Sequence, residues 1–292
     1  MELQRIADYL SSLECDADEL LEEMRTYAEL HDVPIVRPET ESFLRTMVAA
    51  KRPERILEIG TAIGYSTIVM ARAQAGAVIT GPELECGGDG TEGQCAEKKA
   101  AAGKAVQLPC LVTIESWERR IPIAQENLRK AGLSETVQLI HGDAGAVLKA
   151  LCGEQNLARC SDKEQEAAQR LDKAQGFNNK EQETAQQFDL VFLDAAKGQY
   201  LNWLPDILRL MRDGALLIAD NVLQDHTVME PRCTVERRER TTHSRMREFL
   251  YEIKHCPELV SAVIPLGDGV SISVRQRNED GSKSALTYSI VK

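Results

Sequence analysis

The stretch RILEIGTAIGYS, residues 55–66, decides the fold of this chain. An apolar run reaches an acid, Glu58, and two glycines four residues apart follow it, Gly60 and Gly64. Glycine allows a ligand and the next helix to approach the backbone without a Cβ in the way. The pattern therefore predicts a buried strand that ends in a binding turn and leads into a helix.

Strand and helix patterns alternate on both sides of this stretch. Apolar strands are expected over 54–59, 110–115, 136–144, 188–196 and 215–222, and an antiparallel pair over 259–276. Helices are expected over 65–74, 117–132, 144–152, 200–214 and 239–255, with N-terminal helices over 2–31 and from Pro38. Together they predict an α/β fold, a doubly wound, Rossmann-like, seven-stranded and mostly parallel sheet with an antiparallel C-terminal strand and N-terminal helices.

Two stretches interrupt this alternation, 81–109 and 153–187. The first is rich in Gly, Lys, Glu and Ala, and the second is polar and Gln-rich. Both fall between a helix and the next strand, where long insertions cost little free energy. We therefore expect one domain over 1–292 with two loop insertions.

Composition indicates a soluble chain of 292 residues with a net charge of −11. No run of about 18 apolar residues is present, and the acidic N-terminus lacks the apolar region of a signal peptide. The eight cysteines form no CxxC pair, so we expect reduced thiols and a cytoplasmic location. Cys86, Cys95 and Cys110 fit no standard zinc spacing.

An acid stands at the carboxyl end of each expected parallel strand: Glu58, Glu115, Asp143, Asp194 and Asp220. One such acid is usually a helix cap. Five on the same rim point to a ligand site, because open parallel sheets bind ligands outside the carboxyl ends of their strands.

The glycine turn does not fit a dinucleotide, because the third glycine of that fingerprint is missing and Glu58 would repel a pyrophosphate. A carboxylate suits a ligand with an ammonium or sulfonium group, and S-adenosylmethionine has both. Glu115 is placed to accept ribose hydroxyls, and Asp143 to meet the adenine amine. A nicotinamide-dependent dehydrogenase is disfavoured on the same grounds.

A second cluster is expected where strands 188–196 and 215–222 end, with Asp194, Asp220 and Asn221. Three oxygen ligands suit Mg²⁺, or Mn²⁺ or Ca²⁺, and not zinc. The alternative for Asp220 and Asn221 is a local Asx turn. Lys197 lies three residues beyond Asp194, where a nearby cation would lower the pKa of its amine and let it act as a base.

The chain resembles the metal-dependent O-methyltransferases of the catechol and caffeoyl-CoA type over about residues 30–275, without the insertions. The motifs that carry this resemblance are ILEIGTAIGYS, VTIE, HGDA, FLDAAKGQY, IADNVL and PLGDGVSIS. The resemblance implies Asp194, Asp220 and Asn221 as metal ligands and Lys197, with Asp194, as catalytic residues. It implies cofactor contacts at Val36, Glu58, Gly60, Ser66, Glu115, Asp143, Ala144 and Asp194. The family lacks a counterpart for the insertions. For Trp117 two roles stay open: its ring stacks on the adenine of the cofactor, or it is part of the core.

VPIVRPET, GTAIGYS, DAAKGQY and NVL are most similar to the bacterial branch that methylates 5-hydroxyuridine at the wobble position of tRNA. That resemblance implies 5-methoxyuridine as the product and tRNA as the partner, and a homodimer is usual among such proteins. Arg232–Arg247, with six arginines and two glutamates, would face the tRNA; otherwise it is a solvated helix face or an oligomer contact. A small catechol-like or phenolic acceptor is the alternative. A non-catalytic cofactor- or RNA-binding module is disfavoured by the intact set of Asp194, Lys197, Asp220 and Asn221.

Overall fold

The computed structural model describes residues 18–76, 110–153, 187–224 and 226–276, together with Tyr9 and Leu13. The first predicted insertion and all but the end residues of the second lie outside the described residues. The first half of the predicted N-terminal helical stretch also lies mainly outside them. No helix in the described part of the chain is long and apolar enough to cross a membrane.

One seven-stranded sheet forms the centre of the molecule, in the order β3-β2-β1-β4-β5-β7-β6. Six strands run parallel to one another, and β7 is antiparallel to both of its neighbours. The strand bounds are β1 Ile56–Ile59, β2 Leu111–Glu115, β3 Val137–His141, β4 Phe188–Leu193, β5 Met211–Ala219, β6 Leu259–Ile264 and β7 Val270–Arg275. This confirms the predicted fold class.

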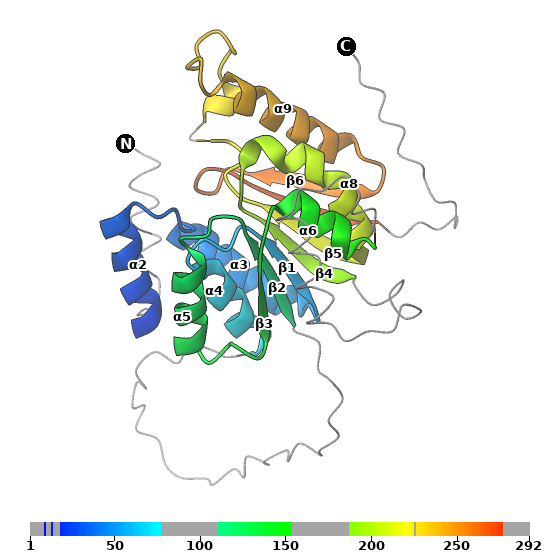
Figure 1. Cartoon of the computed structure of the whole chain (residues 1–292). Coiled ribbons are helices and arrows are strands. Elements are labelled where there is room, and N and C mark those ends of the chain that lie inside the picture. Colours follow the sequence, from blue (N-terminus) through cyan, green and yellow to red (C-terminus); the bar gives the residue numbers. More distant parts are fainter. Residues whose placement is uncertain are drawn as a thin grey trace, which may run out of the picture.

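Helices cover both faces of the sheet (Figure 1). One apolar layer joins the sheet to α2 Glu19–His31, α3 Pro38–Lys51, α4 Tyr65–Gln74 and α5 Ile121–Lys130. The opposite layer joins it to α6 Ala144–Leu151, α8 Tyr200–Leu210 and α9 Arg240–His255. Two short 3₁₀ turns, η2 Lys197–Gln199 and η3 Thr227–Met229, follow β4 and β5.

A buried polar contact fixes α2 and α3 against the start of α4. The Tyr65 hydroxyl donates to Glu41 Oε2 at 2.5 Å and accepts from Arg25 Nε at 2.6 Å. Arg25 also pairs with Glu41, which is only 4% exposed. Because Tyr65 comes directly after Gly64, this network anchors the N-terminal helices to the glycine turn.

The carboxyl ends of the central strands lie level with one another. Ile59 pairs with Leu193, and Leu193 pairs with Ala219, so the residues that follow each strand emerge side by side. The order of the strands reverses at β1: β2 and β3 extend the sheet on one side of it, and β4 and β5 extend it on the other. Such a switch point is where open α/β sheets bind their ligands.

Several predicted boundaries differ from the structure; among them, the helix predicted over 200–214 ends at Leu210, and β5 begins at Met211. The pairing between β4 and β5 shifts register between Phe188 and Leu190, and Gly214, at φ +75°, lies in the resulting bulge. Lys51 Nζ donates to the Gly214 carbonyl at 2.8 Å. Gly214 therefore belongs to a strand bulge that a side chain from α3 holds in place, and it does not end the helix.

Candidate active site

The glycine turn after β1 is pressed against the backbone that follows β4. Gly60 has a φ of +107°, and a methyl group there would overlap the carbonyl oxygen of Asp194. Gly64, at φ +87°, is the residue immediately before α4. The close approach expected at Gly60 is thus made by the chain itself, and it holds this turn beside the residues after β4.

Glu58 lies wholly inside the protein, with 0% of its surface exposed. Its Oε1 accepts a hydrogen bond from Ser66 Oγ at 2.6 Å, and its Oε2 accepts from Thr113 Oγ1 at 2.6 Å and from Thr67. Burial raises the pKa of Glu58 to about 7, although these hydroxyls act to lower it. Glu58 therefore fixes the first turn of α4 through Ser66 and Thr67. Direct contact of Glu58 or Ser66 with a cofactor stays a prediction.

Glu115, at the end of β2, is held by backbone N–H groups. Its Oε2 accepts from Ala62 at 2.7 Å, and its Oε1 accepts from Ser116 at 2.9 Å and Trp117 at 2.8 Å. Ala62 has a φ of +49°, a conformation that few non-glycine residues adopt. Glu115 thus fixes the shape of the glycine turn across the sheet, next to the position expected for the ribose.

Three further residues are predicted to contact the cofactor. Asp143 and Ala144 follow β3, and Val36 precedes α3. Asp143 is exposed and caps α6, since its Oδ1 accepts from the Ala146 N–H at 3.0 Å. Ala144 and Val36 are buried, at 9% and 5% exposure. The helix cap alone accounts for Asp143, so cofactor contacts at these three residues stay predictions.

The predicted catalytic and metal-binding residues form one cluster after β4 and β5. Lys197 Nζ donates to Asp194 Oδ1 at 2.6 Å, to Asn221 Oδ1 at 2.7 Å and to the Tyr200 hydroxyl at 3.0 Å. Burial lowers the pKa of Lys197, but the charges of Tyr200 and Asp194 outweigh it and raise the pKa above its ordinary value. In this arrangement Lys197 is therefore a protonated ammonium that donates to three oxygens.

Asp220 lies directly beneath this cluster and is only 2% exposed. Its Oδ1 accepts from the Asn221 N–H at 2.8 Å, so a local turn of the kind considered from the sequence is present. Burial, followed by the negative charge of Asp194, raises the pKa of Asp220 to about 7.

These donors fit a divalent cation. Asp194 and Asn221 already direct one oxygen each at a single positive charge, and the buried Asp220 carboxyl comes directly before Asn221 in the chain. Within the described ranges no group of three His, Cys, Asp or Glu side chains gathers, which is compatible with this set because its third donor is an amide. Carboxylate and amide oxygens are ligands for Mg²⁺, Mn²⁺ and Ca²⁺.

Tyr200 is a member of the cluster that the sequence did not single out. It is 0% exposed, and its hydroxyl donates to the Leu193 carbonyl at 3.1 Å while it accepts from the Ala195 N–H at 3.2 Å. Burial raises its pKa to about 12. Its only sequence signal is a position three residues after Lys197, which places both side chains on one face of a helical turn.

Trp117 is 51% exposed, so the core position considered for it is wrong. The Arg120 guanidinium lies over its ring, 4.3 Å from the centroid. Because the Trp117 N–H is bound by Glu115, this aromatic surface stays next to the acid that ends β2. Stacking of an adenine on Trp117 stays a prediction.

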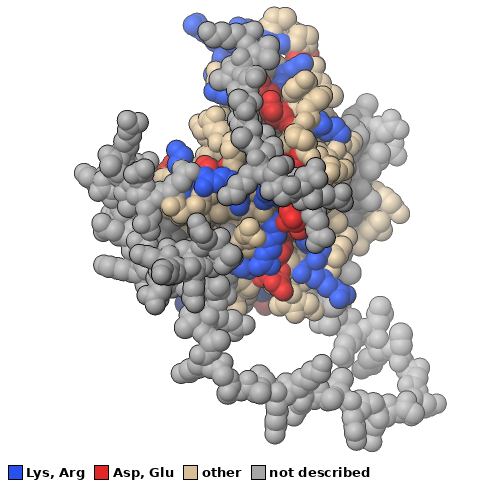
Figure 2. Space-filling model, turned by 90° about the vertical axis from the view of Figure 1, so that its right-hand side faces the viewer, with Lys and Arg blue, Asp and Glu red and all other residues tan. Residues whose placement is uncertain are grey.

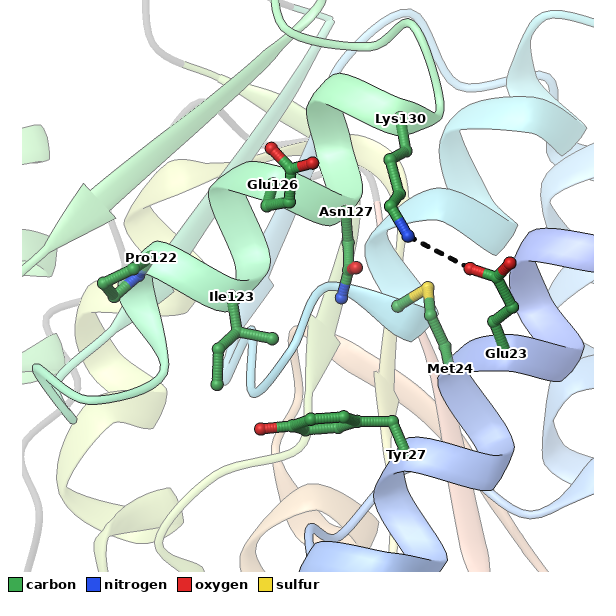
Figure 3. Close-up of a pocket in the computed structure, with 8 residues that line it drawn as sticks. All are labelled: Glu23, Met24, Tyr27, Pro122, Ile123, Glu126, Asn127 and Lys130. Atoms are coloured by element: carbon green, nitrogen blue, oxygen red, sulfur yellow. Dashed lines mark hydrogen bonds and ion pairs between the residues drawn. The ribbon is translucent and has the colours of Figure 1, made fainter.

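A separate hollow of about 370 Å³ lies between α2 and α5 (Figure 3). Met24, Tyr27 and Ile123 give it apolar walls, and the Lys130–Glu23 ion pair, at 3.0 Å, crosses its edge. It contains none of the predicted site residues. Its link to the site is indirect: Asn127 Nδ2 donates to the Ile63 carbonyl in the glycine turn at 2.9 Å.

Four of the six arginines in Arg232–Arg247 contact carboxylates or backbone carbonyls of the same chain. Arg238 pairs with Glu236 and Glu239, Arg245 pairs with Glu248, and Arg240 and Arg247 donate to backbone carbonyls. On the visible part of the face shown in Figure 2, basic groups predominate at the top, and acidic groups lie among basic ones further down. Arg232 and Arg237 are the exposed arginines of this segment for which the structure shows no such contact among the described residues.

Comparison with known proteins bears on the family and the fold of this chain. Residues 162–276 match the family model described as O-methyltransferase. The chain has an O-methyltransferase fold. The O-methyltransferase from Bacillus cereus, solved with S-adenosylhomocysteine, superposes with a TM-score of 0.62, 22% identity and coverage of 93% of this chain and 97% of that one. The O-methyltransferase TomG from Streptomyces achromogenes, solved with S-adenosylmethionine, superposes with a TM-score of 0.64 and is 23% identical. The alignment covers 95% of this chain and 100% of TomG.

Among curated proteins, a catechol O-methyltransferase from Niastella koreensis is 29% identical over 199 residues. That alignment takes in 68% of this chain but only 63% of the relative, so the chain spans less than two thirds of that O-methyltransferase. The relatives therefore support the predicted family of catechol and caffeoyl-CoA type and the predicted enzyme class. They carry no indication of the tRNA branch.

Proposed function

We propose that this chain is an S-adenosylmethionine- and divalent-metal-dependent O-methyltransferase. The observation that carries the proposal is that Lys197 Nζ contacts both Asp194 Oδ1, at 2.6 Å, and Asn221 Oδ1, at 2.7 Å, where β4 and β5 end. The backbone of Asp194 also packs against Gly60. A cofactor on the glycine turn and an acceptor on this cluster would therefore lie next to each other.

The glycine turn and Glu115 suit the cofactor half of the site. The turn is fixed from two sides, by the Asp194 backbone at Gly60 and by Glu115 at Ala62. Glu115 remains 7% exposed, at the edge where a ribose is expected. S-adenosylmethionine or its product is bound in the related structures named above, which supports the same cofactor here.

Asp194, Asp220 and Asn221 would hold the metal. A bound divalent cation would balance their negative charge, chelate two neighbouring oxygens of the acceptor and lower the pKa of the acceptor hydroxyl and of Lys197. Lys197 and Tyr200 contribute through their positions. We expect Lys197 Nζ to lie where an acceptor hydroxyl would lose its proton, and the Tyr200 hydroxyl accepts a hydrogen bond from this amine. In the transfer, an oxygen–carbon bond forms, the sulfur–methyl bond breaks, and Lys197 or solvent takes the proton.

We place a small acceptor with two adjacent oxygens, of the catechol type, first. A relative that aligns over 68% of this chain is named for that substrate class. Four of the six arginines in Arg232–Arg247 are already bound within the protein, and the chain has a net charge of −11. Neither property favours the many phosphate contacts that a tRNA needs.

5-Hydroxyuridine in tRNA is the second candidate, because it offers a similar pair of adjacent oxygens. Exposed Arg232 and Arg237 are the observation in its favour. A homodimer and a cytoplasmic location accompany both candidates as expectations.

Methyl transfer from labelled S-adenosylmethionine tests the proposal. We would offer a simple catechol and tRNA carrying 5-hydroxyuridine, each with Mg²⁺ and with a chelator. Chelator-sensitive labelling of catechol supports the first candidate, and labelling of tRNA alone moves the function to the second. A matched Asp220→Asn variant should lose transfer while it still binds S-adenosylhomocysteine. Transfer that survives both the chelator and Asp220→Asn would refute a metal-dependent reaction.

A further inference from the structure

The turn between β6 and β7 is locked onto the loop that carries Asn221. The Leu223 N–H donates to the Asp268 carbonyl at 2.8 Å, and the Val222 N–H donates to the Gly269 carbonyl at 2.9 Å. A methyl group at Gly269 would overlap the Leu223 side chain. The turn and the loop therefore act as one unit, although 47 residues separate Asn221 from Asp268.

The Asp268 carboxylate contacts Asn221 from the side opposite Lys197. Asp268 Oδ2 accepts a hydrogen bond from Asn221 Nδ2 at 3.2 Å, while Asn221 Oδ1 accepts from Lys197 Nζ at 2.7 Å. A carboxylate can only accept and an ammonium can only donate, so the two partners together determine which end of the amide faces which. With Asp268 in place, the amide oxygen must face Lys197 Nζ.

Asp268 is itself held in position. Arg37 Nη2 lies 2.6 Å from Asp268 Oδ1, and the Asp268 side chain is only 15% exposed. Asn221 has a φ of +55°, a left-handed conformation in which Asp220 holds its N–H. The orientation of Asn221 is thus defined at its backbone by Asp220 and at its amide by Asp268.

We propose that Asp268 is a positioning residue that keeps the Asn221 amide oxygen directed at the cation site. This inference rests on the proposed function, because it assigns Asn221 as a metal ligand. Without Asp268, the Asn221 NH₂ group loses the acceptor that holds it away from the cation site, and the orientation of the amide then depends on Lys197 alone. Outer partners that orient a metal ligand typically change metal affinity 10- to 100-fold.

Titration of the full-length protein with Mn²⁺, followed by electron paramagnetic resonance, tests the inference without a measurement of turnover. Asp268→Ala should weaken Mn²⁺ binding about 10-fold or more. Asn221→Ala should weaken it too, and the double variant should be no weaker than Asn221→Ala alone, because Asp268 acts only through that amide. Arg37→Gln is the matched control, since it removes the ion pair of Asp268 with Arg37 but leaves the Asn221 contact, and it should have a smaller effect.

The outcomes separate this inference from the proposed function. Wild-type protein whose Mn²⁺ binding is abolished by Asp220→Asn, with unchanged affinity in Asp268→Ala, would refute the role of Asp268 and leave the function standing. Additive losses in the double variant would also refute it, because Asp268 would then act through its own charge. Wild-type protein that binds no Mn²⁺ would refute both. Thermal unfolding of each variant shows whether a loss of affinity reflects a loss of fold.

Discussion

The carbonyl oxygen of Asp194 occupies the space in which a side chain at Gly60 would begin. This contact joins the turn expected for the cofactor to the loop that carries the candidate metal and catalytic residues. The two halves of the site are therefore set at a fixed spacing by the backbone, before any ligand binds.

Gly60→Ala should for this reason damage both stability and cofactor binding. The added methyl group must displace backbone, and φ +107° is unfavourable for alanine, so we expect a loss of about 2 to 5 kcal/mol in the free energy of unfolding. Chemical denaturation and calorimetric binding of S-adenosylhomocysteine measure the two effects. Gly132→Ala is the matched control: its φ is +70°, nothing lies within 4 Å, and it should cost only about 1 kcal/mol. Equal losses in the two variants would mean that the Asp194 contact is unimportant.

Glu58 predicts a pH dependence of stability. Its pKa is about 7 in the folded protein and 4.5 ordinarily, so between these pH values the folded state holds a proton that the unfolded state has released. The free energy of unfolding should therefore fall as the pH rises from about 4.5 to 7, with a slope of up to about 1.4 kcal/mol per pH unit from this group. Glu58→Gln stays neutral and should lose that part of the slope. Denaturation curves at several pH values, with exposed Glu118→Gln as the control, check this; identical slopes for wild type and Glu58→Gln would contradict it.

The sequence was sufficient for the strand ends because each is marked twice, by the end of an apolar run and by an acid or a glycine. Gly60, Glu115, Asp194 and Asp220 all lie where those marks placed them. The direction in which Glu58 points was not predictable. All four residues of β1 are buried, so the two faces of that strand carry no alternating signal.

Contacts between distant segments were equally beyond the sequence. Asp268 reaches Asn221 only because β7 pairs antiparallel with β5 and brings the turn before β7 over the end of β5. The bulge at Gly214 likewise depends on a partner, Lys51, that lies 163 residues away. Local patterns predict elements, whereas such pairs depend on the register between elements.

Lys197 is predicted to act in the transfer and, separately, to compete with the metal. Its ammonium contacts the same two oxygens that a cation would use, so Lys197→Gln should bind Mn²⁺ more tightly than wild type does. Methyl transfer should nevertheless fall about 100-fold or more, because the base is lost. Mn²⁺ titration and steady-state rates measure the two effects, and exposed Lys149→Gln is the control. A variant with weaker Mn²⁺ binding and an unchanged rate would contradict both roles.

Arg232 and Arg237, for which the structure shows no contact with a carboxylate or carbonyl among the described residues, decide between the two acceptor classes. Arg232 and Arg237 are exposed, whereas Arg238 and Arg245 are paired with glutamates. If the acceptor is a small catechol, the double variant Arg232→Gln/Arg237→Gln should keep the catechol turnover of wild type within about twofold, because the substitutions lie outside the cluster around Asp194. If tRNA is the acceptor, the same variant should bind tRNA more weakly, and the slope of affinity against salt should fall by about 1 for each phosphate contact removed. The paired arginines, changed in Arg238→Gln/Arg245→Gln, are the matched control, since they carry equal charge but are already engaged. A selective loss of tRNA methylation in the first double variant alone would overturn the preference for a small acceptor.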